Sequence, residues 1–160
     1  MGEVQDKVFH RPSEVHDAEY LACYIREIDK QECAAMSPDD TILDSLLKSY
    51  FISEECNTII ANREPIGMFG VFRESDTTGV VWMLGSEKIK DVSFSFLKKS
   101  RKWVESKMDE YETLHNWVGS DNEVSINWLG FLGFEFGQQA RQGGMTFVHF
   151  ERNRKCAKQS

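Results

Sequence analysis

The sequence predicts an α+β fold, in which helices flank a mixed and mostly antiparallel sheet. Three observations lead to this prediction. The 160-residue chain is 41% hydrophobic, which is enough to build the core of one ordinary domain. Its apolar residues change several times between the period of a helix and the alternation of a strand. The expected strands outnumber the expected helices, and three of them follow one another across short turns.

The N-terminal third is expected to hold one short strand and two helices. A strand at residues 6–11 is followed by Pro12, which suits a first helical turn, and by Ser13, which can cap a helix. Apolar residues at helical spacing then run through residues 15–28, which predicts one continuous helix with a buried face. A second helix follows the SPDD turn, with Asp40 as the expected cap.

The middle of the chain is expected to form an antiparallel meander. TIIANREPIGMFGVF, residues 58–72, predicts two strands joined by a turn at residues 62–65, and VVWMLG supplies a third strand after the SDTTG turn. Gly67 and Gly70 lie inside the second of these strands. They indicate a bulge or a close approach of the backbone, although packing against large neighbours explains them equally well.

The C-terminal half continues with a helix from about Val92 and a strand at YETLHNWVG. The stretch NEVSINWLGFLGFEFG then predicts a helix that ends at Gly133, where a left-handed residue is often needed, and a strand that starts directly at Phe134. A hairpin of FEFGQQAR and MTFVHFER across the QGG turn closes the fold. We expect one domain at residues 1–151 and a flexible basic tail at residues 152–160.

Charge and cysteine patterns exclude several classes of protein. The net charge of −7 makes nucleic acid an unlikely partner. Residues 88–107 are locally basic, which suits a phosphate or an acidic partner, or simply a solvated helix face. The four cysteines and four histidines show no metal-ligand spacing, so no metal site and no disulfide framework are expected. The sequence has neither a signal peptide nor a membrane-spanning run, so no membrane anchor is expected.

The order of elements, the Asn122-x-x-Ser125 pattern and the Gly133-Phe134 helix end resemble the GNAT superfamily of acyl-CoA-dependent N-acetyltransferases. This resemblance runs through most of the chain. It implies a GNAT-like fold, with a twisted, mostly antiparallel central sheet of about six to seven strands flanked by about four helices. WMLGS, residues 82–86, followed by LKKSRKWVESKMDEYETLHNWVGSDNEVSINWLGFLGFEFG, residues 97–137, resembles a divergent bacteriophage branch, the internal virion proteins of short-tailed coliphages. This second resemblance covers about the last ninety residues before the tail. That similarity implies phage structural proteins or a host protein as partners, and a location in the host cell cytoplasm or in the virion.

The resemblance also implies where acetyl-CoA would bind. In active members the fourth strand, which ends here at Leu84, runs into a glycine-rich loop whose backbone N–H groups hold the pyrophosphate at a helix N-terminus. This chain has GSEKIKDVSFSF there, with glycine only at position 85 and Asp91 close to the helix start. We therefore interpret the acyl-CoA site as degenerate. The segment's cofactor-binding candidates are Met83, Leu84, Gly85, Lys88, Lys90 and Ser93.

A second group of site residues follows the fifth strand. Asn122 and Ser125 match the asparagine and the small residue of the family, and the resemblance places them beside the cofactor. The tyrosine that protonates the departing CoA thiolate in many members is replaced by Leu129, which has no proton to donate. No distinctive context marks a general base. Glu64, Glu74 and His115 are candidates, and a half-buried structural role is the alternative for His115.

Two hypotheses about function follow. In the first, the chain is a bacteriophage GNAT-fold protein that acts through protein contacts, in virion assembly or as an internal virion component. Burial is the default expectation for Phe94, Phe96 and Phe131, and if exposed they would form an apolar patch suited to a partner. In the second, it is an active acetyl-CoA-dependent N-acetyltransferase that modifies a host or phage amine. The resemblance requires a gap between the fourth and fifth strands in either case.

Overall fold

The computed structural model describes residues 8–154 of the chain. Within these residues seven strands form one sheet in the order β1-β2-β3-β4-β5-β7-β6. The strands are β1 (Phe9–Pro12), β2 (Glu55–Ala61), β3 (Glu64–Arg73), β4 (Thr78–Gly85), β5 (Thr113–Gly119), β6 (Glu135–Gln142) and β7 (Met145–Asn153). The helices are α1 (Val15–Ala22), α2 (Glu27–Met36), α3 (Ile42–Ile52), α4 (Phe94–Lys107) and α5 (Glu123–Phe131), with the 3-10 helix η1 (Glu87–Asp91) between β4 and α4.

This architecture confirms the predicted α+β fold with a mostly antiparallel sheet. All neighbouring strands run antiparallel except β4 and β5, which are parallel. The number of strands lies within the expected range, and the described residues contain one α-helix more than expected. The meander of β2, β3 and β4 and the closing hairpin of β6 and β7 are confirmed.

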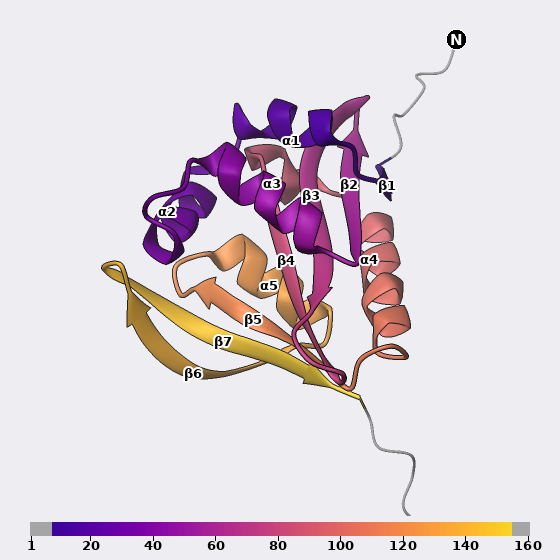
Figure 1. Ribbon diagram of the computed structural model, residues 1–160. Coiled ribbons are helices and arrows are strands. Elements are labelled where there is room, and N and C mark those ends of the chain that lie inside the picture. Colours follow the sequence, from indigo (N-terminus) through magenta and orange to yellow (C-terminus); the bar gives the residue numbers. More distant parts are fainter. Residues whose placement is uncertain (1–7, 155–160) are drawn as a thin grey trace, which may run out of the picture.

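Helices cover both faces of the sheet (Figure 1). Leu21 of α1 and Leu46 of α3 join Met68 of β3 in one buried apolar cluster. On the other face, Val71 of β3 packs with Val104 of α4 in a second cluster, which the partly buried side chains of α5 extend. Successive side chains of a strand point to opposite faces, so β3 contributes to both cores. The middle of the sheet is therefore buried on both sides.

The predicted single helix over residues 15–28 is wrong, because the chain leaves the helix after Ala22. Ile25 instead forms an isolated antiparallel bridge with Ser86, and the backbone N–H of Arg26 donates to the carbonyl of Gly85 at 2.9 Å. This contact ties the segment between α1 and α2 to the end of β4, and a new helix starts at Glu27. A bond to a strand distant in sequence has overridden local helical periodicity.

The cap of α3 also differs from the prediction. Thr41, and not Asp40, is the N-cap, and its hydroxyl accepts from the N–H of Asp44 at 3.0 Å while the Asp44 carboxylate accepts from the N–H of Thr41. This reciprocal pair is a capping box. Asp40 instead forms an exposed ion pair with Lys48.

The β2–β3 turn and the strand glycines agree with the sequence. Asn62 and Arg63 have φ of 51° and 65°, the left-handed values that a tight hairpin turn requires. The register between β2 and β3 shifts at Ile59 and Ile60, which places a bulge next to Gly67. Gly70 marks a close approach, since a Cβ there would lie 2.6 Å from the carbonyl oxygen of Glu55.

Helix α5 ends as predicted, directly against the sheet. Gly133 has a φ of +90°, its N–H donates to the Gly130 carbonyl at 3.1 Å, and the N–H of Phe134 donates to the Leu129 carbonyl at 3.1 Å. These two bonds form a Schellman motif, which satisfies carbonyl groups at the end of the helix. Because glycine adopts the left-handed conformation without steric cost, the chain turns here and enters β6.

The C-terminal boundary needs one correction. Strand β7 continues to Asn153, into the segment assigned to the tail, and Arg152 donates from Nη1 to the Leu132 carbonyl at 2.8 Å. Residues 155–160 of that segment lie outside the described residues, as do residues 6 and 7 of the first expected strand. No helix within residues 8–154 is long and apolar enough to cross a membrane.

Candidate functional site

Strands β4 and β5 separate after a short parallel contact. They pair only over Thr78–Val80 and Thr113–His115, and both continue beyond this contact without pairing to each other. Asn116 stands where they diverge, and its Nδ2 donates to the carbonyl of Val81 at 2.8 Å. A gap therefore opens between the two central strands toward their C-terminal ends.

The backbone of β4 offers peptide groups to this gap. The N–H of Gly85 donates to Asp29 at 3.0 Å and the carbonyl of Gly85 accepts from Arg26, so both groups point away from β3. The peptide groups of an antiparallel strand change direction with each residue, so those of Met83, two residues earlier, point the same way. Met83 thus turns its N–H and C=O toward the unpaired part of the gap.

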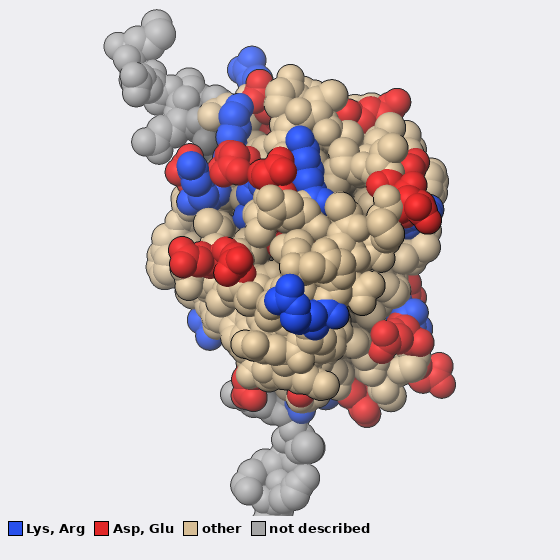
Figure 2. All heavy atoms as spheres, turned by 90° about the vertical axis from the view of Figure 1, so that its left-hand side faces the viewer, with Lys and Arg blue, Asp and Glu red and all other residues tan. Residues whose placement is uncertain are grey.

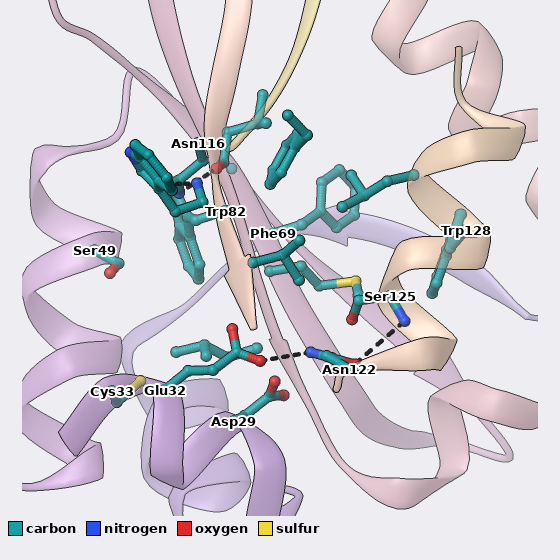
Figure 3. A pocket seen from close by; sticks show the side chains of 18 of the residues that line it. Asp29, Glu32, Cys33, Ser49, Phe69, Trp82, Asn116, Asn122, Ser125 and Trp128 are labelled. Carbon is teal, nitrogen blue, oxygen red and sulfur yellow. Dashed lines mark hydrogen bonds between the residues drawn. The ribbon is translucent and has the colours of Figure 1, made fainter. Parts of the chain in front are cut away.

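A cavity of about 380 Å³ occupies the gap (Figure 3). Trp82 belongs to the apolar cluster of α1 and α3, whereas Phe69 packs on the other face, and both line the cavity. The cavity therefore passes through the sheet. Its walls are mainly apolar and aromatic, and Glu32 and Cys33 of α2 supply polar groups on one side. Volume and lining are those of a small-molecule site.

A buried ion pair holds α2 against the end of β4. Arg26 and Asp29 are 4% and 2% exposed, and the guanidinium contacts both carboxylate oxygens, at 3.0 and 2.7 Å. Burial raises the pKa of Asp29, while the charge of Arg26 and the N–H of Gly85 act in the opposite direction. A bidentate pair with an added backbone donor is the arrangement in which two charges remain stable inside a protein.

The same network reaches α5 through Asn122. This residue is the N-cap of α5, and its Oδ1 accepts from the N–H of Ser125 at 3.3 Å while its Nδ2 donates to Glu32 at 2.6 Å. Arg26 also donates to Asn122 and to the hydroxyl of Ser125. Burial, only partly offset by the Asn122 amide, raises the pKa of Glu32 to about 6. A carboxyl group with a pKa near neutrality, at a cavity wall, is suited to proton transfer.

The segment between β4 and α4 is held by hydrogen bonds within the chain and by the packing of Ile89. The N–H of Ser86 donates to the carbonyl of Ile66 at 2.9 Å, and the hydroxyl of Ser86 accepts from the N–H of Lys88. Ile89 of η1 is 1% exposed, and its side chain lies over Gly85, where an added Cβ would come within 2.8 Å of it. Several backbone donors of this loop thus have partners within the chain.

Comparison with solved structures identifies the fold. A GNAT-family acetyltransferase from Bacillus anthracis superposes with a TM-score of 0.66 at 9% identity, over 94% of this chain and 97% of that one. AAC(6')-Ib in complex with ribostamycin and coenzyme A gives 0.65 at 18% identity, over 93% and 94%. The ribosomal-protein-S5-alanine acetyltransferase of Vibrio fischeri gives 0.64 at 14% identity, over 99% and 98%.

The chain has the GNAT acetyltransferase fold. At these identities the likeness establishes the fold alone. No protein-family model matches the sequence, and no curated protein matches it either.

The cofactor-binding residues expected from the GNAT resemblance lie in three different settings. Met83, Leu84, Asn122 and Ser125 line the cavity, which brings the two separate sequence segments together. Gly85 lies at the end of β4, outside the cavity lining. Its N–H donates to Asp29 of α2, and its carbonyl accepts from the N–H of Arg26, the residue before α2. The other three lie outside the cavity lining: Lys88 pairs with Glu64, Lys90 is exposed, and Ser93 caps α4 through the N–H of Phe96.

Helices α4 and α5 of the GNAT fold contact each other through aromatic side chains. Phe96 is 1% exposed and meets Trp128 edge to face, and Trp128 donates from Nε1 to the Ser100 hydroxyl at 3.1 Å. Phe96 is therefore buried, as expected by default for these aromatic residues, and takes no part in an exposed patch. Phe94 is 61% exposed and contacts Phe131. Leu129, at the family's tyrosine position, is partly buried and lines the cavity.

The candidate bases lie at two other places. Glu64 forms an exposed ion pair with Lys88 at 2.7 Å. Glu74 and His115, named separately from the sequence, contact each other at 3.0 Å, and the other ring nitrogen of His115 lies 2.8 Å from His149. None of these three candidate bases lines the cavity.

Sequence reasoning missed Arg26, Asp29 and Glu32. Arg26 is the N-cap of α2, and Asp29 and Glu32 lie within this helix, where charged residues usually face solvent. The only available signal was the sequence Arg26-Glu27-Ile28-Asp29, whose i,i+3 spacing permits a helical ion pair. Nothing in the neighbouring sequence indicates that this ion pair is buried against β4.

Proposed function

We propose that this GNAT-fold chain has a degenerate acyl-CoA site and acts by binding rather than by acetyl transfer. One observation carries the proposal: at the end of β4, the N–H of Gly85 already donates to Asp29 and that of Ser86 to Ile66. A pyrophosphate needs free N–H donors and positive potential at this place. In this chain both N–H groups are already hydrogen-bonded, and the group that faces the N–H of Gly85 is the Asp29 carboxylate.

The nearby basic side chains do not replace the missing donors. Lys88 is paired with Glu64, and the hydrogen bond and charge of Glu64 raise the pKa of Lys88. Ile89 fills the space beside Gly85 that a phosphate group would need. Binding of acetyl-CoA would therefore require the loop to open and its internal bonds to break.

We propose a protein as the partner. The sequence similarity to internal virion proteins favours a phage structural protein, met in the host cell cytoplasm during assembly or inside the virion; a host protein is the alternative. Phe94 and Phe131 support this, because Phe94 is 61% exposed and contacts the half-buried Phe131, with Lys98 and Arg101 over their rings. On the face shown in Figure 2, basic side chains lie among acidic ones, which does not favour nucleic acid.

Acetyl-CoA binding tests the degenerate site. A ligand at a hundred times its dissociation constant adds about 2.7 kcal/mol to the free energy of unfolding. We expect no rise in melting temperature at millimolar acetyl-CoA or CoA, with an active GNAT enzyme as the positive control. A rise that disappears in the Lys88→Ala, Lys90→Ala double variant would refute the proposal and place the cofactor at this loop.

Co-purification tests the partner. Tagged protein from infected cells is expected to retain portal or core proteins of the virion, and Phe94→Ser is expected to reduce their yield. Phe51→Ser is the matched control, because Phe51 is also exposed, at 69%, but lies on α3. Equal yields for wild type and both variants would remove the Phe94 surface from the proposal.

An active N-acetyltransferase is the second candidate, and the cavity favours it. Met83 offers unpaired peptide groups that can hold a thioester carbonyl, and Glu32 lies at the cavity wall as a possible base for an amine. Acetylation of simple amines by wild type, lost in Glu32→Gln with acetyl-CoA binding unchanged, would establish this function in place of the first.

A further inference from the structure

Three side chains form a hydrogen-bonded row on β5, β7 and the turn after β3. His115 Nδ1 lies 2.8 Å from His149 Nε2, and His115 Nε2 lies 3.0 Å from a carboxylate oxygen of Glu74. The side chain of His115 is 20% exposed and that of Glu74 is 53% exposed. The row is thus reachable from solvent, and its two imidazoles turn nitrogen atoms toward each other.

A fourth residue stands beside this row. In the antiparallel pair of β5 and β7, Glu151 lies directly opposite His115 and Trp117 opposite His149. Leu114 is buried in the core beneath α4, so the alternation of a strand puts His115 on the other face, together with Glu151. Directly opposed residues have Cβ atoms about 5 Å apart, so a rotation of the Glu151 side chain brings its carboxylate to the imidazoles.

This set of donors matches one class of ligand. Two imidazole nitrogens and a carboxylate are the ligands of zinc and related divalent transition metals. Histidines that bind such metals almost always donate their other ring N–H to a carboxylate, and His115 has Glu74 in that position. We propose that His115 Nδ1, His149 Nε2 and Glu151 bind a divalent transition metal of the zinc class, with Glu74 as the residue that orients His115.

Metal binding requires three side chains to move. Two nitrogens that share a tetrahedral zinc ion are about 3.3 Å apart, given bonds of about 2.0 Å, so the imidazoles, whose nitrogens now face each other across 2.8 Å, must separate by about half an ångström. Both rings must also turn toward a common point, and the Glu151 side chain must rotate toward them. The site also adjoins the cavity, because the ring of Trp117, which lines it, lies 5.0 Å from the ring of His149. None of its residues belongs to the β4–α4 loop, so it does not depend on the proposed function.

A second group of possible ligands provides the control. Within the described residues, Glu14, His16 and Asp17 are the group whose ligand atoms already all lie within 4.8 Å of one another. Asp17, however, is 0% exposed, and its carboxylate already accepts from Arg11 and from the Thr58 hydroxyl. We therefore expect this group to bind metal weakly or not at all.

Calorimetric titration of the purified chain with Zn²⁺, repeated with Co²⁺, tests the site. We expect one ion per chain, an affinity reduced roughly 100-fold or more by His115→Gln or His149→Gln, and one reduced about 10- to 100-fold by Glu74→Gln. His16→Gln is expected to bind as wild type does. Melting curves without metal verify that each variant is folded. No binding at millimolar metal, or binding that survives both His115→Gln and His149→Gln, would overturn the proposal.

Discussion

The Asp29 carboxylate accepts a hydrogen bond of 3.0 Å from the backbone N–H of Gly85, which joins the start of α2 to the end of β4. In the GNAT fold, the end of this strand leads into the loop that the sequence resemblance assigns to the cofactor. In the proposed function this bond has two effects: it fixes α2, and it occupies a backbone N–H that could otherwise hold an anion.

Removing the carboxylate should destabilise the fold strongly. Asp29→Ala leaves the guanidinium of Arg26 buried without a counter-charge and the N–H of Gly85 without an acceptor, which costs about 3–5 kcal/mol. Chemical denaturation measures the change. Asp40→Ala, which breaks only the exposed pair with Lys48, should have a far smaller effect. Similar decreases in the free energy of unfolding for the two variants would contradict this account of the buried pair.

The helix end at Gly133 gives a second prediction. Gly133→Ala forces a side chain into a φ of +90° and should lower the free energy of unfolding by about 1–2 kcal/mol. Gly130→Ala is the matched control, because it lies within α5 and nothing stands within 4 Å of its added Cβ. There alanine should stabilise by up to about 1 kcal/mol. The melting temperatures of the two variants should thus shift in opposite directions relative to wild type.

Glu32 predicts a dependence of stability on pH. Burial raises its pKa from 4.5 to about 6, so between these values the folded state binds more protons than the unfolded state. The free energy of unfolding therefore falls as pH rises through this window, by about 2 kcal/mol in total, and levels off above it. Glu32→Gln cannot titrate. The free energy of unfolding of wild type minus that of the variant should fall by that amount from pH 4 to pH 7; an unchanged difference would show that Glu32 has an ordinary pKa.

The close approach at Gly70 gives a fourth prediction. Gly70→Ala places a Cβ 2.6 Å from the carbonyl oxygen of Glu55, which is backbone and cannot rotate away, and should cost about 1–3 kcal/mol. Gly137→Ala, in the exposed strand β6 with nothing within 4 Å of the added Cβ, should be nearly neutral. Urea denaturation distinguishes them, and a neutral Gly70→Ala would mean that β2 and β3 separate easily.

Short-range patterns accounted for most of the elements. The meander, the closing hairpin and the stop at Gly133 depend on residues close in the chain, through alternation, turn chemistry and the conformational freedom of glycine. The same patterns failed at residues 23–26, where pairing with Ser86 interrupts an otherwise helical run. They favoured burial of Phe96 and Trp128 but gave no indication that the two rings contact each other.

By itself, the sequence determined the α+β class, the order of the strands along the chain and the presence of a single glycine, Gly85, in residues 85–96. Only the tertiary structure decided which polar groups meet: Asp29 with Gly85 across 56 residues, Asn122 with Glu32 across 90, and His115 with His149 across 34. The physical reason is that helix caps and periodicity are set by neighbours within a few positions, whereas these contacts arise when separate elements pack on one sheet.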